Sequence, residues 1–314
     1  MTTAPAPPSA PPAGDPALGP GVSGSAPHGG PVAGRRPRTM SKAAVNAALV
    51  MAALYTSFPL VWMLMAAGKD ATGIMSGQVL SLRHFDLLGN LSGLVHQDGG
   101  IYLRWYGNSL FYAGVGSAVC ALISVCAGYA FDVYEFRGKE KLFGFVLLGV
   151  LVPSAATVLP LYLLASKVHL VNTVWAILIP SVVNPFGVYL ARVFSAGYVP
   201  AEVLEAARVD GASELRIFRS IGLPMLKSGF TTIMLFQFSA IWNGFFLALV
   251  MLSNQHLYPV SLGLYMWNDS VSTDAPSMIS LVISGSVIAV VPVILLFICL
   301  QRFWRAGLTA GSVK

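Results

Sequence analysis

Six long stretches of the chain are apolar and contain no Asp, Glu, Lys or Arg, so all of the formal charge lies between them or outside them. The stretches lie near residues 43–67, 107–131, 142–165, 172–191, 229–252 and 277–300. A helix of ~20 residues matches the ~30 Å hydrocarbon core of a bilayer. The stretches lack the two-residue alternation of barrel strands, and only helices or closed barrels satisfy the backbone in lipid. The pattern predicts an all-α integral membrane protein with six transmembrane helices.

The composition agrees with a membrane protein and excludes several other classes. Of the 314 residues, 55% are apolar and 10% are charged, whereas an ordinary soluble domain carries about 25% charged residues. These values exclude a disordered protein, a disulfide scaffold and a nucleic-acid-binding domain of the usual charged kind. Cys120, Cys126 and Cys299 lie within apolar stretches without a C-x-x-C spacing. They are interpreted as packing residues rather than metal ligands or redox groups.

The positions of the cations predict the orientation of the chain. With the N-terminus inside the cell, 15 of the 19 Lys and Arg residues fall on the cytoplasmic side and 4 fall outside. Cytoplasmic loops of membrane proteins carry an excess of Lys and Arg. We therefore expect a multi-pass protein of the cell membrane, embedded in the lipid bilayer, with both termini in the cytoplasm. This topology accounts for the net charge of +6, and no nucleic-acid partner is needed.

The chain divides by composition into three parts. Residues 1–42 are rich in Pro, Gly and Ala and poor in large apolar side chains, so they are expected to form a disordered cytoplasmic tail. Residues 43–301 form the expected transmembrane domain, and residues 302–314 a cytoplasmic tail. Within the domain, the inner loop 192–228 is long and charged, whereas loops that only connect helices are usually short.

The second half of this loop has the pattern of two short helices with a bend between them. Residues 201–210 are strong helix formers, and Gly211 can end that helix in a left-handed conformation. Ser213 can then cap a second helix over 214–222, which Pro224 is expected to end. The pattern alone fits an amphipathic helix resting on lipid as well as an element that docks on a protein.

Short blocks of residues in this loop recur in a known family. They are Glu205-Ala206-Ala207, Asp210-Gly211-Ala212, Phe218, Ile221, Leu223 and Pro224. Together they resemble the EAA motif of ABC importer permeases. The similarity extends across residues 43–314, and the tail 307–314 is similar to that of the carbohydrate-uptake branch, the MalG-type permeases.

This resemblance implies an ABC importer type I permease fold (MetI-like) and a role as the transmembrane permease subunit of an ATP-driven, binding-protein-dependent sugar importer. In that family the loop forms a coupling helix that sits in a cleft of the cytoplasmic ATPase. The residues expected to couple to the ATPase are Glu202, Glu205, Ala206, Ala207, Arg208, Asp210, Gly211, Ala212, Phe218, Leu223 and Pro224. Glu205 and Arg208 are expected to be charged anchors for the partner.

The resemblance also implies the partners. They are a second homologous permease subunit, two cytoplasmic ATPase subunits and an extracytoplasmic solute-binding protein, which the outer loops 68–106 and 253–276 are expected to face. The chain has no G-x-x-x-x-G-K-[ST] phosphate-binding loop. We therefore expect no enzyme activity and no bound cofactor or metal, with ATP and Mg used by the partner ATPase.

Two other functions remain open at this point. An ion-coupled secondary transporter would normally carry ionisable residues inside its spans, and the six stretches have none. An ABC importer subunit for a non-sugar solute fits the loop as well as a sugar importer does.

Polar residues and prolines interrupt three of the stretches and are candidates for the substrate pathway. Pro153 and Pro160 are expected to break the third stretch. The candidate pathway residues are Tyr162, Asn184, Trp242 and Asn243, with Trp242 able to stack on a sugar face. The alternative is that Asn243 bonds a neighbouring helix and that the prolines only shape packing.

Overall fold

The computed structural model describes residues 40–77, 79–81, 85–273 and 277–310, without the side chains of residues 40, 41, 272, 273 and 300–310. Within these residues every regular element is helical, as predicted. The chain divides into two units, residues 1–53 and 54–314. The first unit contributes only the start of helix α1 (Met40–Ala67) to the described structure, because residues 1–39 of the predicted tail lie outside the described residues.

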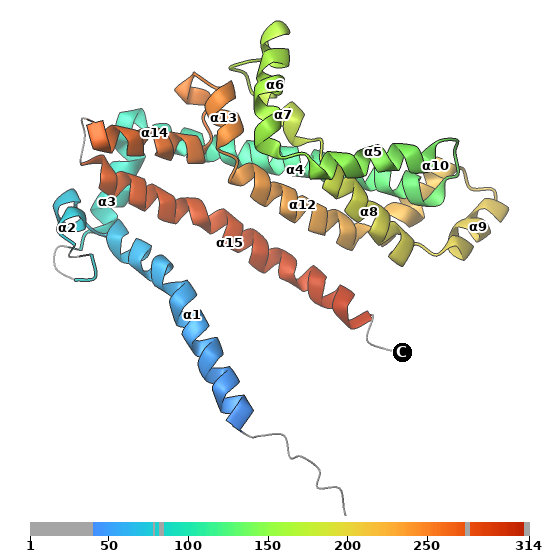
Figure 1. The fold of residues 1–314 in the computed structure, drawn as a ribbon, viewed down its shortest axis with the longest axis horizontal. Helices are drawn as coiled ribbons and strands as arrows, with labels where there is room; N and C mark the ends of the chain where they lie inside the picture. Colours follow the sequence, from blue (N-terminus) through green and yellow to red (C-terminus); the bar gives the residue numbers. More distant parts are fainter. Residues whose placement is uncertain (1–39, 78, 82–84, 274–276, 311–314) are drawn as a thin grey trace, which may run out of the picture. The chain divides into compact units, whose positions relative to one another are not determined.

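The second unit contains the rest of α1, two short 3-10 helices (Gln97–Gly99 and Gln255–Leu257) and all other described α-helices (Figure 1). In chain order these are α2 (Ala71–Met75), α3 (Leu87–His96), α4 (Ile101–Val133), α5 (Lys139–Leu151), α6 (Ser154–Lys167), α7 (Trp175–Ser181), α8 (Pro185–Tyr198), α9 (Ala201–Val209), α10 (Glu214–Ile217), α11 (Leu223–Met225), α12 (Lys227–Trp242), α13 (Phe246–Met251), α14 (Val260–Thr273) and α15 (Met278–Ala310). A π-helical segment, Phe218–Gly222, joins α10 to α11.

Four helical segments are long and apolar enough to cross a membrane, and a bent pair would make a fifth. The four are Lys42–Ala67, Ile101–Val133, Trp175–Tyr198 and Met278–Cys299. The pair is α5 with α6, whose axes differ in direction by 103°. The described structure therefore confirms an all-helical protein with four or five candidate spans, where the sequence predicted six.

The predicted helix over 229–252 is wrong as a single element. Helix α12 ends at Trp242, and α13 begins at Phe246 after a tight turn in which the Gly244 N–H bonds the Ile241 carbonyl at 3.0 Å. Asn and Gly are poor helix formers, which favours an end at Asn243-Gly244. The Ser261 hydroxyl donates to the Gly244 carbonyl at 3.2 Å and so satisfies one of the groups that the break frees.

The two prolines of the third stretch behave differently. Val152, with ψ 119°, stands before Pro153 at the bend between α5 and α6, as expected because proline disfavours helical geometry in the residue before it. Pro160 lies inside α6, which continues past it to Lys167. The expected break at Pro160 is therefore wrong, since a helix can continue past a proline when its surroundings satisfy the freed carbonyl.

Helix α4 is the central element of the second unit and packs against α8 and α12 (Figure 1). These contacts depend on small residues. A Cβ added to Gly128 would collide with Ala191 of α8, and one added to Gly116 would lie 2.8 Å from the Ile241 Cδ1 of α12. Close backbone approach through small residues is typical of helix packing in membranes.

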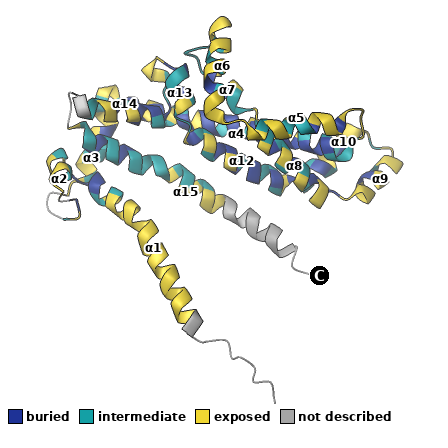
Figure 2. Cartoon of the chain, in the orientation of Figure 1, coloured by how far each residue is buried: buried dark blue, intermediate teal, exposed yellow. Residues whose placement is uncertain are grey.

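Helix α1 contrasts with this core. Its side chains from Leu54 to Trp62 are all exposed, although most are apolar (Figure 2). Burial begins only at Ala66 and Ala67, where the Ala67 carbonyl accepts hydrogen bonds from the Asn90 amide at 2.8 Å and the Ser284 hydroxyl at 3.0 Å. The exposed apolar side chains suit contact with lipid or with another membrane chain.

Candidate functional site

The predicted bend of the inner loop is present at Gly211. Its φ is +79°, in the left-handed region, which glycine adopts without the steric penalty of a Cβ. The Gly211 N–H bonds the Arg208 carbonyl, and the Ala212 N–H bonds the Ala207 carbonyl, both at 3.0 Å. These two bonds form a Schellman motif that ends α9. No other atom lies within 4 Å of an added Cβ, so backbone conformation alone requires the glycine.

An ion pair closes the bend. The Arg208 Nε donates to the Glu214 Oε1 at 2.7 Å, and Nη2 donates to Oε2 at 3.3 Å. This hydrogen bonding from Arg208 lowers the pKa of the Glu214 carboxyl and raises that of the guanidinium. Arg208 was expected to anchor a partner; within this chain it binds Glu214, and the partner contact stays a prediction. Sequence reasoning missed Glu214, because a six-residue spacing becomes a contact only after the chain has bent.

The two short helices α9 and α10 with the bend between them form a hairpin, residues 201–217. The Glu214 carboxylate also joins this hairpin to the end of α4. The Tyr134 hydroxyl hydrogen-bonds it, and Tyr134 directly follows α4. Burial, with the Glu214 bond as a smaller cause, raises the pKa of the Tyr134 phenol. The phenol therefore stays protonated and can donate at neutral pH.

A buried apolar cluster fixes the α9–α10 hairpin to the bundle. Leu204 of α9 is 3% exposed and Ile217 of α10 is 1% exposed, and both belong to a cluster with Tyr129 of α4. The Tyr129 and Phe218 rings lie 4.9 Å apart. A Cβ on Gly222 would lie 2.8 Å from the Tyr129 ring. The hairpin is thus packed on the last turns of α4 and is not a freely hinged loop.

The coupling residues predicted from the sequence divide into two groups. Those with exposed side chains or backbone are Glu202, Glu205, Ala206, Arg208, Asp210, Gly211 and Pro224. Those that are half-buried are Ala207, Ala212, Phe218 and Leu223. Six members of the first group lie on the hairpin and form its outward surface, whereas Pro224 lies in α11; the second group helps to attach the hairpin.

Two large apolar side chains extend the outward surface and were not singled out for this role from the sequence. Val209 is 88% exposed and Leu215 is 65% exposed. They flank the Gly211 bend, one on each arm of the hairpin. Exposed apolar side chains beside small and acidic residues are suited to binding another protein.

The second arm of the loop differs from its predicted form. Ser213 precedes α10, but its side chain makes no capping hydrogen bond. Pro224 does not end the helix, because the chain passes from α10 through the π-helical segment and α11 into α12. Proline lacks an N–H and is tolerated in the first turn of a helix. The last bond of the π-helical segment runs from the Leu223 N–H to the Phe218 carbonyl. Helix α11 begins at Leu223, so Pro224 lies in its first turn.

The break between α7 and α8 is bonded to α12. Asn184 caps α8 by accepting from the Gly187 N–H at 3.0 Å, and its amide donates to the Gln237 Oε1 at 2.7 Å. The Gln237 Nε2 donates to the Ser181 carbonyl at 2.6 Å. Sequence reasoning named Asn184 but missed Gln237, since the two lie 53 positions apart.

The other predicted pathway residues lie in different surroundings. Trp242 is 4% exposed, its indole N–H donates to the Ala289 carbonyl of α15 at 2.9 Å, and its ring stacks on Phe238. Asn243 is exposed, but its amide bonds the Ser239 carbonyl of its own helix at 2.8 Å. Tyr162 is half-buried on α6. Of the four predicted pathway residues, Asn243 is the one classed as exposed in the structure.

At the far end of α4, a cluster of polar side chains fixes the segment after α13. Asn108 donates to the His256 and Tyr258 carbonyls at 2.9 and 3.0 Å, and the Trp105 indole donates to the Gln255 carbonyl at 2.8 Å. Asn172, with φ +59°, accepts from the Ser253 and Asn254 N–H groups. This segment therefore presents a fixed shape at the end of α4 opposite the hairpin.

Comparison with known proteins identifies the family. The family described as "Binding-protein-dependent transport system inner membrane component" matches residues 122–306, more than half of the chain and the whole hairpin. The chain belongs to this family. This permease is therefore a multi-pass inner membrane protein, and its family of ABC permease subunits is not catalytic.

Individual relatives support the same assignment. The permease is 33% identical to the arabinooligosaccharides transport system permease protein AraQ of Halalkalibacterium halodurans, over 82% of this chain and 91% of that protein. It is 30% identical to the lactose transport system permease protein LacG of Rhizobium radiobacter, over 85% and 94% of the two chains.

A solved structure supports the fold of the permease. A chain in the crystal structure of a bacterial ABC transporter involved in the import of the acidic polysaccharide alginate matches with a TM-score of 0.74 and 23% identity. The match covers 85% of this chain and 98% of that chain. At this identity the likeness establishes the fold and nothing about the substrate.

Proposed function

We propose that the permease is one of two homologous membrane subunits of an ATP-driven importer for oligosaccharides or other sugars. The support for this substrate class comes from relatives whose names refer to arabinooligosaccharides, lactose and maltodextrin. The maltodextrin transport system permease protein MdxG of Bacillus subtilis is 31% identical over 69% of this chain. The remaining partners are two cytoplasmic ATPase subunits, which use ATP and Mg, and an extracytoplasmic solute-binding protein.

The proposed topology has six crossings and both termini in the cytoplasm. The crossings are the four segments that are long and apolar enough by themselves, the bent pair α5–α6, and the broken pair α12–α13. The support is the distribution of cations, of which 15 of 19 fall on one side in this arrangement. In the proposed topology the α9–α10 hairpin lies inside the cell and the fixed segment 253–258 lies outside, where this segment would face the binding protein.

The hairpin is the proposed entry point for work done by the ATPase. One observation carries this proposal: the exposed bend at Gly211 is closed by the Arg208–Glu214 pair and packed through Leu204 and Ile217 onto α4. Alternating access needs an element that moves as a unit with the helices it drives. The hairpin meets that need, because its bend is closed by an ion pair and its inner side chains are buried against α4. Its outer surface carries small, apolar and acidic side chains.

The proposed pathway passes the helix breaks near Asn184 and Asn243. The support is that broken helices are tolerated in membranes where they line a cavity or are buried in protein. Tyr162 is retained as a pathway residue on α6. The burial of Trp242 favours a positioning role, in which it holds the end of α12 against α15.

The test is uptake and ATP hydrolysis by the intact complex in proteoliposomes. Gly211→Asp is expected to leave the complex inserted while sugar uptake falls and uptake per ATP hydrolysed is lost. Glu205→Lys should act similarly at the outward surface. Candidate substrates are arabinooligosaccharides, lactose and maltodextrins supplied with the matching binding protein.

Gly138 offers a matched control. It also has a positive φ, +86°, and open space around an added Cβ, but it lies at the start of α5. Gly138→Asp should therefore cause similar local strain without the coupling defect. Normal uptake by the Gly211 variant, or an equal defect in both, would contradict the proposed role of the hairpin. Uptake that follows a proton gradient without any ATPase would contradict the ATP-driven mechanism.

A further inference from the structure

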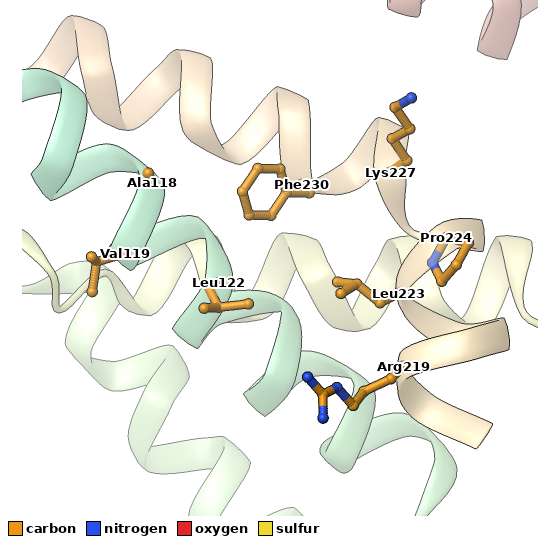
Figure 3. Close-up of a pocket in the computed structure, with 8 residues that line it drawn as sticks. All are labelled: Ala118, Val119, Leu122, Arg219, Leu223, Pro224, Lys227 and Phe230. Carbon is orange, nitrogen blue, oxygen red and sulfur yellow. The ribbon is translucent and has the colours of Figure 1, made fainter. Parts of the chain in front are cut away.

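A groove of about 560 Å³ lies between α4, α12 and the segment that follows the hairpin (Figure 3). Six of its eight described lining residues are apolar: Ala118, Val119, Leu122, Leu223, Pro224 and Phe230. The other two are the cations Arg219 and Lys227, and none of the eight is acidic. The groove therefore combines an apolar wall with positive charge.

The cations stand at one end of the apolar wall. Helix α12 runs antiparallel to α4, since Gly116 of α4 faces Ile241 near the end of α12, and Tyr129 near the end of α4 faces Gly222 in the segment that leads into α12. In this register Lys227, the first residue of α12, lies beyond Phe230 towards the hairpin end of α4. Arg219 precedes it in the chain and is nearer still to the hairpin. In the proposed topology this is the level of the inner membrane surface.

Arg219 is available for a ligand. The structure gives this guanidinium no hydrogen bond or ion pair among the described residues, and its side chain is exposed. Figure 3 shows it extending from the segment after the hairpin towards α4, while Lys227 lies on another side of the groove. A guanidinium binds a phosphate group in a two-point arrangement.

Further apolar side chains continue the wall away from the cations. Phe111, Val115, Val119 and Leu122 recur along α4 at three- to four-residue spacing, and all four are exposed. This spacing places them on one helix face. An extended hydrocarbon chain lying in the groove could follow that face into the membrane interior.

We propose that the groove binds one anionic phospholipid of the inner leaflet. Its phosphate is held by Arg219, Lys227 adds a second positive charge, and one acyl chain lies along Val119 and Leu122. Charge complementarity selects this occupant, because the pairing of cations with an apolar wall matches a negatively charged headgroup and its hydrocarbon chain. The inference rests on the proposed orientation of the chain, which places the cations at the cytoplasmic surface.

A bound lipid here would act on the proposed coupling segment. Leu223 lines the groove and is half-buried beside the hairpin cluster. Lipid in the groove would support the contact between α12 and α4 from the membrane side. Occupancy would therefore connect the lipid composition of the membrane to the efficiency of coupling.

The test is native mass spectrometry of the intact complex released from bilayers of phosphatidylglycerol and phosphatidylcholine. We expect retained phosphatidylglycerol, one per copy of this chain. Arg219→Gln and Lys227→Gln should each lower its retention about fivefold, the effect typical of one cation at a membrane surface. Arg216→Gln is the matched control, because Arg216 is exposed on α10 but does not line the groove.

A second variant tests the apolar wall without changing charge. Leu122→Trp should fill the groove and reduce retained phosphatidylglycerol while the complex stays assembled. Retention equal to wild type in both glutamine variants, or equal retention of phosphatidylcholine, would overturn the proposal. So would dissociation of the two permease chains by Leu122→Trp, which would show that a protein covers the groove. Lipid retention is read without transport, so failure of the proposed function would appear separately, as absent sugar uptake with lipid still bound.

Discussion

Arg208 and Glu214 form a two-point ion pair across the bend at Gly211, with Nε–Oε1 at 2.7 Å and Nη2–Oε2 at 3.3 Å. The pair links α9 to α10, two helices that are too short to be stable by themselves, since isolated helices below about 12 residues have only marginal stability in water. Glycine permits the bend, and the ion pair limits how far its two arms can separate. In the proposed coupling role, transmission of force through the hairpin would depend on that limit.

Removal of the pair should loosen the hairpin without unfolding the permease. In Glu214→Gln the charge and the two-point acceptor are lost, while Leu204 and Ile217 keep the hairpin packed on α4. We expect amide exchange in residues 201–217 to rise a few-fold, as is typical of a partly exposed pair, and uptake per ATP to fall. Hydrogen-exchange mass spectrometry and transport assays measure the two effects. Arg216→Gln, which alters a neighbouring exposed cation, should change neither the exchange nor the pair.

Acid should open the same hairpin. Hydrogen bonding from Arg208 holds the pKa of the Glu214 carboxyl below its usual range. A lowered carboxyl pKa stabilises the folded state at every pH above the ordinary value, and this stabilisation disappears as pH falls through the lowered one. The protection factors of the amides in residues 201–217, which correct for the pH dependence of intrinsic exchange, should therefore be constant from pH 8 to pH 5 and fall only below the ordinary glutamate range. An equally steep acid response in Glu214→Gln would show that another group is responsible.

Gly222 should tolerate no side chain. A Cβ there would lie 2.8 Å from the Tyr129 Cε2, so Gly222→Ala must displace either the Tyr129 ring or the π-helical segment. Overpacking of this kind costs about 1–3 kcal/mol. Thermal unfolding in detergent should show the loss, and Tyr129→Leu in the same chain should relieve it. Gly197→Ala is the control, because no atom lies within 4 Å of a Cβ at that position; an equal loss there would point to a general effect of helix substitution.

Local chemistry made the hairpin predictable from the sequence. The left-handed position at Gly211 follows from the conformational freedom of one residue, and the helix before it follows from a run of helix formers. The apolar stretches likewise predicted helices correctly, because charge-free runs of this length have few other solutions in a bilayer. The pattern alone left open whether this loop binds lipid or protein. The family resemblance at residues 205–224 then indicated the function.

The parts that sequence reasoning missed depend on tertiary contacts. Pro160 and Pro224 were read as helix breakers, but their helical neighbours accommodate the missing N–H. Gln237 was overlooked because its partner Asn184 is 53 positions away. The burial of Trp242 against α15 was likewise not visible in the sequence, and its proposed contact with sugar stays a prediction.

The Asn184–Gln237 bond should couple α8 energetically to α12. Gln237→Ala leaves the Ser181 carbonyl and the Asn184 amide without their partners, and Asn184→Ala removes the cap of α8. A double-mutant cycle on thermal unfolding should give a coupling energy of about 0.6 kcal/mol, the average for hydrogen bonds between membrane helices. Thr231→Val combined with Asn184→Ala serves as the reference pair, because the Thr231 hydroxyl bonds the Lys227 carbonyl of its own helix. If the stability losses of Gln237→Ala and Asn184→Ala were strictly additive in the double variant, the hydrogen bond between the two side chains would contribute no coupling energy.

A substitution at Trp242 can distinguish a positioning role of this residue from a substrate-binding role. Trp242→Phe keeps a ring against Phe238 but removes the indole N–H that donates to the Ala289 carbonyl at 2.9 Å. If the residue positions α12, stability should fall by about 1 kcal/mol, the usual net value of such a hydrogen bond, and the affinity of the complex for sugar should be unchanged. Differential scanning fluorimetry and equilibrium binding of labelled sugar to the purified complex measure the two quantities. Weaker sugar binding at unaltered stability would instead place the ring on the substrate and require the end of α12 to open during transport.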